Sequence, residues 1–137
     1  MEILTAIKRV PETGAKVNLT EDKQDIDTTS LGFTTSPHEE CAVEGSVQLV
    51  EEHGGTVTAL TMGTEEGTEQ LRSAIAMGAD DGILLETDGD KRGPTATAKA
   101  IADQVDDADA AFDLLVFGNE SADAANHHVG VRVAEEL

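Results

Sequence analysis

A glycine-led polar stretch has the residue types of a ligand-binding loop. The apolar run at residues 114–117 (LLVF) is followed by residues 118–130 (GNESADAANHHVG), which mix small residues with acidic, amide and imidazole side chains. Small side chains leave backbone N–H groups within reach of a ligand, and Ser121 or Asp123 is expected to cap the helix that follows. A polar turn that only starts a surface helix has the same composition, so both interpretations stay open from these residues alone.

The adjacent histidines of this stretch do not predict a metal site. Neighbouring helical residues point about 100° apart, whereas two ligands on one helical face need a spacing of three or four residues. A catalytic role for His127 or His128 is not predicted either, because no nucleophile or acid is placed to act with them. The single Cys41 excludes a multi-cysteine metal centre and an internal disulfide, fits a cytoplasmic protein, and is expected to be a small buried residue.

Four apolar runs predict a mainly parallel sheet. None of them alternates cleanly with polar residues, which is typical of strands buried on both faces. They cover residues 3–7, 57–62, 83–85 and 114–117. Helical patterns follow them at residues 42–50, 71–75, 98–105 and 129–137. This alternation predicts a single α/β domain over residues 1–137, with a doubly wound, Rossmann-type sheet and helices on both faces.

Two places depart from the regular alternation. Residues 11–35 are predicted to be a hairpin or loop insertion, in which Val17 and Leu19 pair with Ile26. At the other end, the apolar stripe of the last helix still continues at Leu137. We therefore expect the chain to be C-terminally truncated, with a further strand missing from one edge of the sheet.

The predicted sheet also indicates where a ligand would bind. In an open parallel sheet, ligands collect outside the carboxyl ends of the strands, beside the N-termini of helices. Residues 6–9, 35–39, 62–64 and 118–130 are expected to converge there. At residues 36–39 (SPHE) the pattern predicts a helix start, with Ser36 as N-cap and Glu39 closing a capping box, although Ser36 is also able to face a ligand.

Composition and missing motifs exclude several functions. The 28 acidic and 9 basic residues give a net charge of −19, which would repel nucleic acid and anionic lipid. Neither a dinucleotide fingerprint nor a P-loop occurs, and no segment has the length and apolarity of a membrane span. With three Phe and no Trp or Tyr, the domain has little with which to stack on a flavin ring, so any redox group is expected to be held elsewhere.

Four segments, taken in order, resemble one family. They are residues 4–10 (LTAIKRV), 36–44 (SPHEECAVE), 71–80 (LRSAIAMGAD) and 118–123 (GNESAD). Together they are similar to the β subunit of electron transfer flavoprotein. The resemblance implies a subunit that pairs with a homologous α subunit, which holds most of the electron-carrying FAD. It also implies that the heterodimer takes electrons from dehydrogenases such as acyl-CoA dehydrogenases and passes them to a quinone reductase, without bond-making catalysis by this subunit.

The same resemblance implies an adenine nucleotide in this subunit, either AMP or, in relatives that bifurcate electrons, a second FAD. Ala6 would line the adenine pocket, Ser36 would stand where the family usually has asparagine, and Met62 would close the pocket. Contacts to the phosphate would come from the loop and the helix start: Gly118, Asn119, Ser121, Ala122, Asp123, Asn126, His127, His128 and Val129. The family's acidic run is reduced here to Asp123, and His128 replaces the usual glutamine, so the resemblance implies that the phosphate is bound mainly by backbone N–H groups.

Two rival classes stay open. The first is a stand-alone adenine-nucleotide sensor that resembles universal stress proteins, although their glycine-rich phosphate loop is not found late in the chain. The second is an adenylating enzyme, although neither a Ser-Gly-Gly loop nor a His-x-Gly-His segment occurs. Binding of free ATP by an isolated homodimer would favour the first class, and turnover of ATP to pyrophosphate the second.

The excess of carboxylates predicts adaptation to high salt. At 1 M salt the screening length falls to about 3 Å, which removes most of the repulsion among surface carboxylates. We expect the protein to unfold at a clearly higher temperature in molar potassium chloride than in dilute buffer, as followed by circular dichroism. Equal or greater stability in dilute buffer would contradict this hypothesis.

Overall fold

Apolar strands that lack a polar face build the centre of the domain. In the computed structural model, which describes residues 1–89, 92–108 and 111–137, four strands form one parallel sheet in the order β7-β6-β1-β8. These strands are β1 (Glu2–Ala6), β6 (Thr56–Gly63), β7 (Asp81–Glu86) and β8 (Leu114–Phe117). The prediction of a parallel sheet from the four apolar runs is confirmed.

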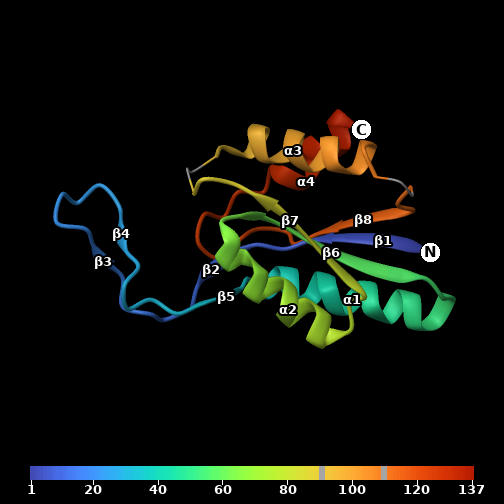
Figure 1. Ribbon diagram of the computed structural model, residues 1–137, viewed down its shortest axis with the longest axis horizontal. Helices are drawn as coiled ribbons and strands as arrows, with labels where there is room; N and C mark the ends of the chain where they lie inside the picture. The colour runs from blue at the N-terminus through green and yellow to red at the C-terminus, as the bar shows by residue number, and fades with distance from the viewer. Residues whose placement is uncertain (90–91, 109–110) are drawn as a thin grey trace.

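Helices cover both faces of this sheet, as the doubly wound prediction requires (Figure 1). One face carries α1 (Pro37–His53) and α2 (Thr68–Met77), the latter preceded by the short 3-10 helix η1 (Glu65–Gly67). The opposite face carries α3 (Pro94–Asp106) and α4 (Val129–Glu136), which pack against each other. The fold class is therefore an α/β domain wound on both sides of a parallel sheet.

The two faces of the central strands supply two separate cores. Ile3 and Val57 contribute to the core beneath α1 and α2, and Leu4 and Leu60 to the core beneath α3 and α4. All four side chains are at most 1% exposed, because alternate residues of a strand face opposite sides. The prediction of strands buried on both faces does not hold for β7 and β8, which are only half-buried. These two strands lie at the edges of the sheet and have one neighbouring strand each.

One polar residue of β1 is accommodated in the core beneath α1. Thr5 is fully buried, and its hydroxyl shares a hydrogen bond of 2.7 Å with the hydroxyl of Ser46 on α1. Ser46 also donates a hydrogen bond to the carbonyl of Ala42, one turn earlier. Because both buried hydroxyls are paired, the contact fixes α1 against β1 without an unsatisfied polar group.

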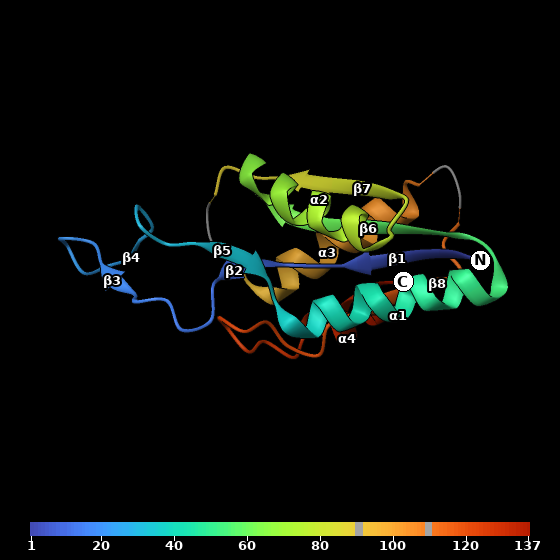
Figure 2. The same ribbon diagram turned by 90° about the horizontal axis from the view of Figure 1, so that it is seen from below.

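The predicted hairpin within residues 11–35 is present and projects from the body of the domain (Figure 2). It consists of β3 (Asn18–Leu19) and β4 (Ile26–Asp27), with Leu19 opposite Ile26. A second antiparallel pair was not predicted: β2 (Arg9–Pro11) binds β5 (Phe33–Thr35). This pair closes the base of the insertion and brings the chain back to the start of α1.

The prediction that Cys41 is buried is wrong, because its side chain is exposed. Cys41 lies on the outer side of α1, whereas Ala42, Val43 and Val47 take the positions that face the sheet. The helical pattern thus locates α1 correctly. Cysteine usually prefers the interior, but position 41 falls on the side of the helix that faces solvent.

Two glycines make a matched test of the helical layer. Gly78 ends α2 and has φ +123°, a backbone conformation that is strained for any residue with a side chain. A β-carbon at this position would also lie 2.9 Å from Cγ1 of Val47. Gly78→Ala should therefore lower the free energy of unfolding by about 1–3 kcal/mol. Gly45 lies inside α1 with open space around it, so Gly45→Ala should raise the same quantity by about 0.5–1 kcal/mol. Urea unfolding of both variants checks the signs, and a stable Gly78→Ala protein would contradict the assigned backbone.

Candidate functional site

The winding of the chain reverses at one end of the sheet. From β1 the chain passes through α1 to β6 on one side, whereas β8 joins the other side of β1 only after α3. These connections lie on opposite faces, so the carboxyl ends of β1 and β8 mark the point where the winding reverses, which is where open α/β sheets bind ligands. Ala6 lies at this point, opposite Phe117 in the register of β1 and β8.

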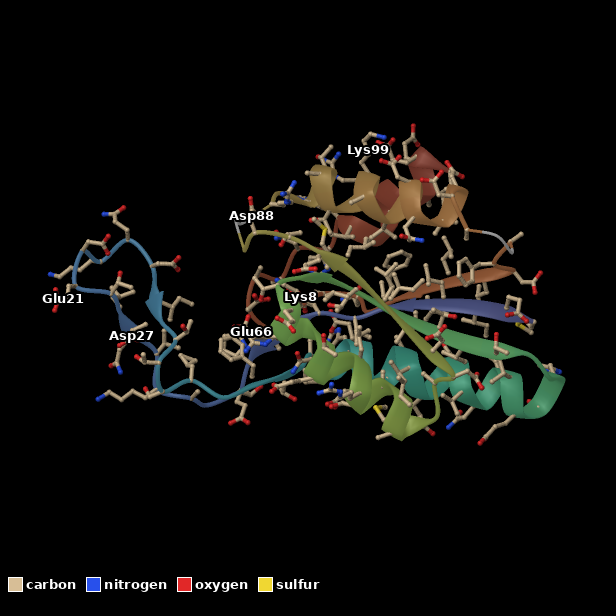
Figure 3. The ribbon with its side chains drawn as sticks, in the orientation of Figure 1. Lys8, Glu21, Asp27, Glu66, Asp88 and Lys99 are labelled. Atoms are coloured by element: carbon tan, nitrogen blue, oxygen red, sulfur yellow. The ribbon has the colours of Figure 1, made fainter. Side chains whose placement is uncertain are left out.

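Lys8 ties the loop after β8 to the end of β1. Its ammonium lies 2.7 Å and 2.9 Å from the carboxylate oxygens of Asp123 and donates to the Ser121 hydroxyl at 3.2 Å. Figure 3 shows Lys8 at the end of the sheet that also faces the hairpin. Burial acts to raise the pKa of Asp123, but hydrogen bonds from Lys8 and Ser121 outweigh it and hold that pKa below its usual value.

Ser36 holds the same loop from the side of α1. The fully buried Ser36 hydroxyl accepts a hydrogen bond of 3.2 Å from the backbone N–H of Ala122. Ser36 is at the N-cap position of α1 and Pro37 follows at the first helical position, as predicted, but the Ser36 side chain makes no capping hydrogen bond. The predicted capping box with Glu39 is therefore wrong, because the Ser36 hydroxyl is used in a long-range contact instead.

Glu39 places a buried carboxyl group against the start of the loop. Its side chain is 6% exposed, and a β-carbon added to Gly118 would lie 2.8 Å from its Cγ and Cδ. Within the described part of the chain, Oε2 of Glu39 has no hydrogen-bond partner. Burial raises the pKa of Glu39, although the Ser36 hydroxyl acts in the opposite direction. Only a glycine at position 118 allows the loop to pass so close to this carboxyl group.

The prediction that Ser121 or Asp123 caps the last helix is wrong. The helix α4 begins at Val129, and its N-cap position is His128, which makes no side-chain capping bond. Ser121 and Asp123 instead bind Lys8, while Ala125 adopts φ +50° and its N–H donates to the Ser121 carbonyl. A left-handed residue interrupts the helical path, so the helix starts later than the composition suggests.

The other predicted site residues are brought to the same end of the sheet but make fewer contacts. On the loop and at the start of α4, Asn119, Asn126 and His128 are exposed and Val129 is partly buried. His127 pairs with Glu120, with 3.0 Å between Nε2 and Oε2. Met62 lies at the end of β6, opposite Leu85 of β7.

Lys8 and Glu39 lie in the segments that were predicted to converge at this end of the sheet, but the sequence pointed only to the basic pair Lys8 and Arg9 as positive charge for a phosphate and predicted no ligand contact for Glu39. The only signal for Lys8 was a basic pair at the end of the first strand, and of that pair only Lys8 binds the loop. Arg9 stacks on the ring of Phe33, 3.5 Å from its centroid. For Glu39 the signal was misleading, because an acidic residue in the first turn of a helix predicts a cap.

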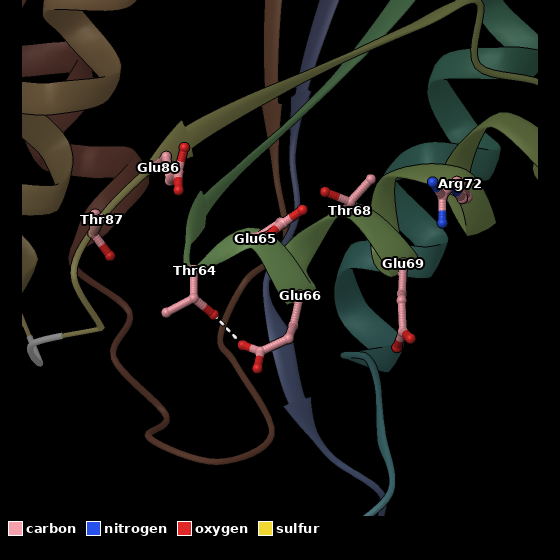
Figure 4. Close-up of a pocket in the computed structure, with 8 residues that line it drawn as sticks. All are labelled: Thr64, Glu65, Glu66, Thr68, Glu69, Arg72, Glu86 and Thr87. Atoms are coloured by element: carbon pink, nitrogen blue, oxygen red, sulfur yellow. Dashed lines mark hydrogen bonds between the residues drawn. The ribbon is translucent and has the colours of Figure 1, made fainter.

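A cavity of about 530 Å³ opens at the same end of the sheet, beyond the carboxyl ends of β6 and β7 (Figure 4). It is lined by Thr64, Glu65, Glu66, Thr68, Glu69, Arg72, Glu86 and Thr87. Four of these residues are glutamates and one is arginine, so the cavity is unsuited to a phosphate or another anion. None of its lining residues belongs to the loop after β8 or contacts Lys8, and we therefore place the candidate site at the loop.

Across residues 1–89, 92–108 and 111–137, no group of three or more His, Cys, Asp or Glu side chains is arranged to hold a metal ion. Over the same residues, every helix is too short or too polar to span a bilayer.

A doubly wound α/β sheet with a polar loop at its reversal point defines a class of ligand-binding domains. Comparison with known protein families identifies the family: the family model of the electron transfer flavoprotein domain matches residues 25–137. The chain therefore belongs to the electron transfer flavoprotein family, which favours the interpretation drawn from the resemblance over the sensor and the adenylating enzyme.

Similar proteins come from distant organisms. The chain is 34% identical over 139 residues to the electron transfer flavoprotein subunit beta of Bacillus subtilis, covering 100% of this chain and 52% of that protein. It is 32% identical to the same subunit of Dictyostelium discoideum, covering 90% of this chain and 48% of that protein. It is 33% identical to the acryloyl-CoA reductase electron transfer subunit gamma of Anaerotignum propionicum, covering 100% of this chain and 52% of that protein. The chain thus spans about half the length of these relatives.

Asp123→Asn tests the contact between Lys8 and the loop. The pKa of Asp123 is lower in the folded protein than in the unfolded chain, so its stabilising effect is present above the ordinary aspartate pKa and is lost as the pH falls through the lowered value. We expect the variant to lose roughly 0.5–1 kcal/mol of unfolding free energy at pH 7, and the loss to vanish in acid. Urea unfolding from pH 7 to pH 3 measures this, with the exposed Glu135→Gln as control. A difference that does not change with pH would contradict the assignment.

Proposed function

We propose that this chain is the nucleotide-binding part of an electron transfer flavoprotein β subunit, and that the loop after β8 holds AMP or the AMP half of a second FAD. The observation that carries the proposal is the convergence of Lys8, Ser36 and Gly118 at the reversal point of the sheet. In this function the subunit does not make or break bonds. It binds a nucleotide that stabilises the native state, because only the folded protein can bind it.

The loop and the start of α4 fit a phosphate. The first backbone N–H groups of a helix have no carbonyl partner within the helix, and the positive end of the helix dipole adds to them. In α4 these groups belong to Val129, Gly130 and Val131, since the first intrahelical bond is donated by Arg132 to the His128 carbonyl. Lys8, which pairs with Asp123 of the same loop, supplies a full positive charge. A phosphate in so acidic a chain needs both contributions.

A phosphate would compete with Asp123 for Lys8. The ammonium group is already engaged by the Asp123 carboxylate at 2.7 Å, and two anions side by side repel each other. We infer that Asp123 moves aside when the nucleotide binds, and that its contact with Lys8 keeps the empty loop in place. Ser36 and the Ala122 N–H exchange their mutual hydrogen bond for contacts to the ligand in the same way.

The wider function follows from the family and concerns the full-length protein. We propose a heterodimer with an α subunit that holds the electron-carrying FAD, acceptance of electrons from dehydrogenases, and their delivery to a quinone reductase. When bound, that FAD supplies the redox chemistry, while the residues of this chain fix the adenine nucleotide of the β subunit. A cytoplasmic location, suggested by Cys41, stays a prediction.

The first test identifies the nucleotides directly. The full-length chain is expressed with its α partner in high salt and denatured, and the released nucleotides are quantified by mass spectrometry. AMP together with one FAD supports a plain electron carrier with a structural nucleotide, and two FAD molecules support a bifurcating type. The absence of any nucleotide beyond one FAD would mean that the loop after β8 is only a polar connection.

A single methyl group provides a sharper test of the loop. In Gly118→Ala the new β-carbon would overlap Glu39 at 2.8 Å, so the loop cannot close over the site and the AMP to FAD ratio should fall well below that of the native heterodimer. Gly45→Ala, where the added carbon meets nothing, serves as the matched control. Melting curves establish that both variants are folded, and full retention of AMP by a folded Gly118→Ala heterodimer would contradict the site.

A further inference from the structure

We propose that Asp113 is a positioning residue of the site: its carboxylate sets the register of β8 on β1 and thereby places the loop after β8 beside Lys8. This inference rests on the proposed nucleotide site and adds to it a residue at the opposite end of the strand.

Asp113 is joined to the first residue of β1 by two hydrogen bonds. Its N–H donates to the Glu2 carbonyl at 2.8 Å, and its carboxylate oxygen Oδ2 accepts from the Glu2 N–H at 2.8 Å. Asp113 immediately precedes β8, so its side chain binds an N–H group of β1 at a level where β8 has not yet begun. An ionised acceptor makes this hydrogen bond stronger than one between neutral groups. The pair fixes which residue of β8 lies beside which residue of β1.

The same arrangement occurs a second time in the sheet. Asp80 immediately precedes β7, its N–H donates to the Val57 carbonyl at 2.8 Å, and its Oδ2 accepts from the Val57 N–H at 2.8 Å. Both edge strands are thus preceded by an aspartate that binds the neighbouring central strand in both directions. The repetition at the two edges indicates that these aspartates set strand register.

The side chains of β8 do not set this register by themselves. A strand that alternates apolar and polar residues is held in register because a shift by one residue would bury its polar face. All four residues of β8 (Leu114–Phe117) are apolar, so a shift by one residue exchanges one apolar face for another. The hydrogen bonds of Asp113 therefore distinguish the observed register from a shifted one.

A shift of β8 would displace the ligand loop. The loop begins at Gly118, directly after the strand, and one residue of a strand spans about 3.3 Å. The contacts that hold the loop tolerate less than that. The Lys8 ammonium lies 2.7 Å from the Asp123 carboxylate. Gly118 packs so closely on Glu39 that an added β-carbon would lie 2.8 Å from it. Asp113 thus acts on the site through the register of β8.

The experiment compares the two aspartates. Full-length heterodimer carrying Asp113→Ala or Asp80→Ala is depleted of nucleotide and titrated with AMP by calorimetry. Each substitution removes one hydrogen bond of an exposed residue beside an edge strand, so we expect similarly small downward shifts of the melting temperature. Asp113→Ala should weaken AMP binding about 10-fold or more, the effect of displacing one hydrogen bond to a charged group. Asp80→Ala should bind AMP as tightly as the native protein, because β7 does not lead into the loop.

A second readout needs no ligand. In the nucleotide-free heterodimer, hydrogen exchange followed by mass spectrometry reports on the amides of Ala122 and Ala125, which donate to the Ser36 hydroxyl and the Ser121 carbonyl. These amides should exchange faster in Asp113→Ala than in the native protein, and at the native rate in Asp80→Ala. Asp113→Asn, which keeps an oxygen acceptor, should restore most of the protection and most of the affinity for AMP.

The outcomes separate this inference from the proposed function. Equal losses of AMP affinity in the two alanine variants, or native binding and exchange in Asp113→Ala, would overturn it. If the native heterodimer does not bind AMP but the loop amides respond to Asp113→Ala alone, the proposed nucleotide site falls and the positioning role of Asp113 holds. If Asp113→Ala does not assemble with its partner, Asp113→Asn is compared with Asp80→Asn. Faster loop exchange in the former supports the inference, and equal exchange contradicts it.

Discussion

Strand β1 has a parallel neighbour along each edge, and the rest of the domain is arranged around that pairing. Ile3 and Leu4 face opposite sides of the sheet and are 0% and 1% exposed, so both sides need a helical cover. The chain meets this requirement by running to β6 on one side and returning to β8 on the other. The reversal leaves the end of β1 between two connections, which is the reason why Lys8, just beyond Ala6, meets a loop more than a hundred residues away in the sequence.

Electrostatics restrict what this site can be. The chain carries a net charge of −19, and at the reversal point of the sheet Lys8 is countered by Asp123, with the buried Glu39 next to the loop. Positive potential there comes from one ammonium group and from backbone N–H groups at the start of α4, and the latter do not depend on side chains. A site of this kind tolerates replacement of loop side chains more readily than changes of loop backbone.

Local sequence patterns predicted most of the fold but only part of the site. The four strands of the central sheet, the helices between them, the glycines that end α1 and α2, and the pairing of Leu19 with Ile26 follow from periodicity and turn composition, which act between near neighbours. The start of α4 was placed too early, because the side chains that look like caps bind Lys8, and that contact depends on the folded sheet. The spacing of Ser36 and Glu39 matches a capping box, but in the folded protein Ser36 binds the N–H of Ala122 and Glu39 packs against Gly118. Both partners come from the far end of the chain, so the local sequence does not reveal them.

The projecting hairpin has a consequence for the evolution of the domain. Val17 and Leu19 are 54% and 60% exposed, so the hairpin adds little to either core, while β2 and β5 join its ends in a short ladder. The entropy of closing a loop rises only slowly with its length once the ends are fixed. Residues can therefore be inserted or deleted between Pro11 and Phe33 without moving Lys8 or Ser36, which lie just outside the ladder. This makes the hairpin the segment where relatives are freest to differ in length while the contacts of Lys8 and Ser36 with the loop after β8 keep their geometry.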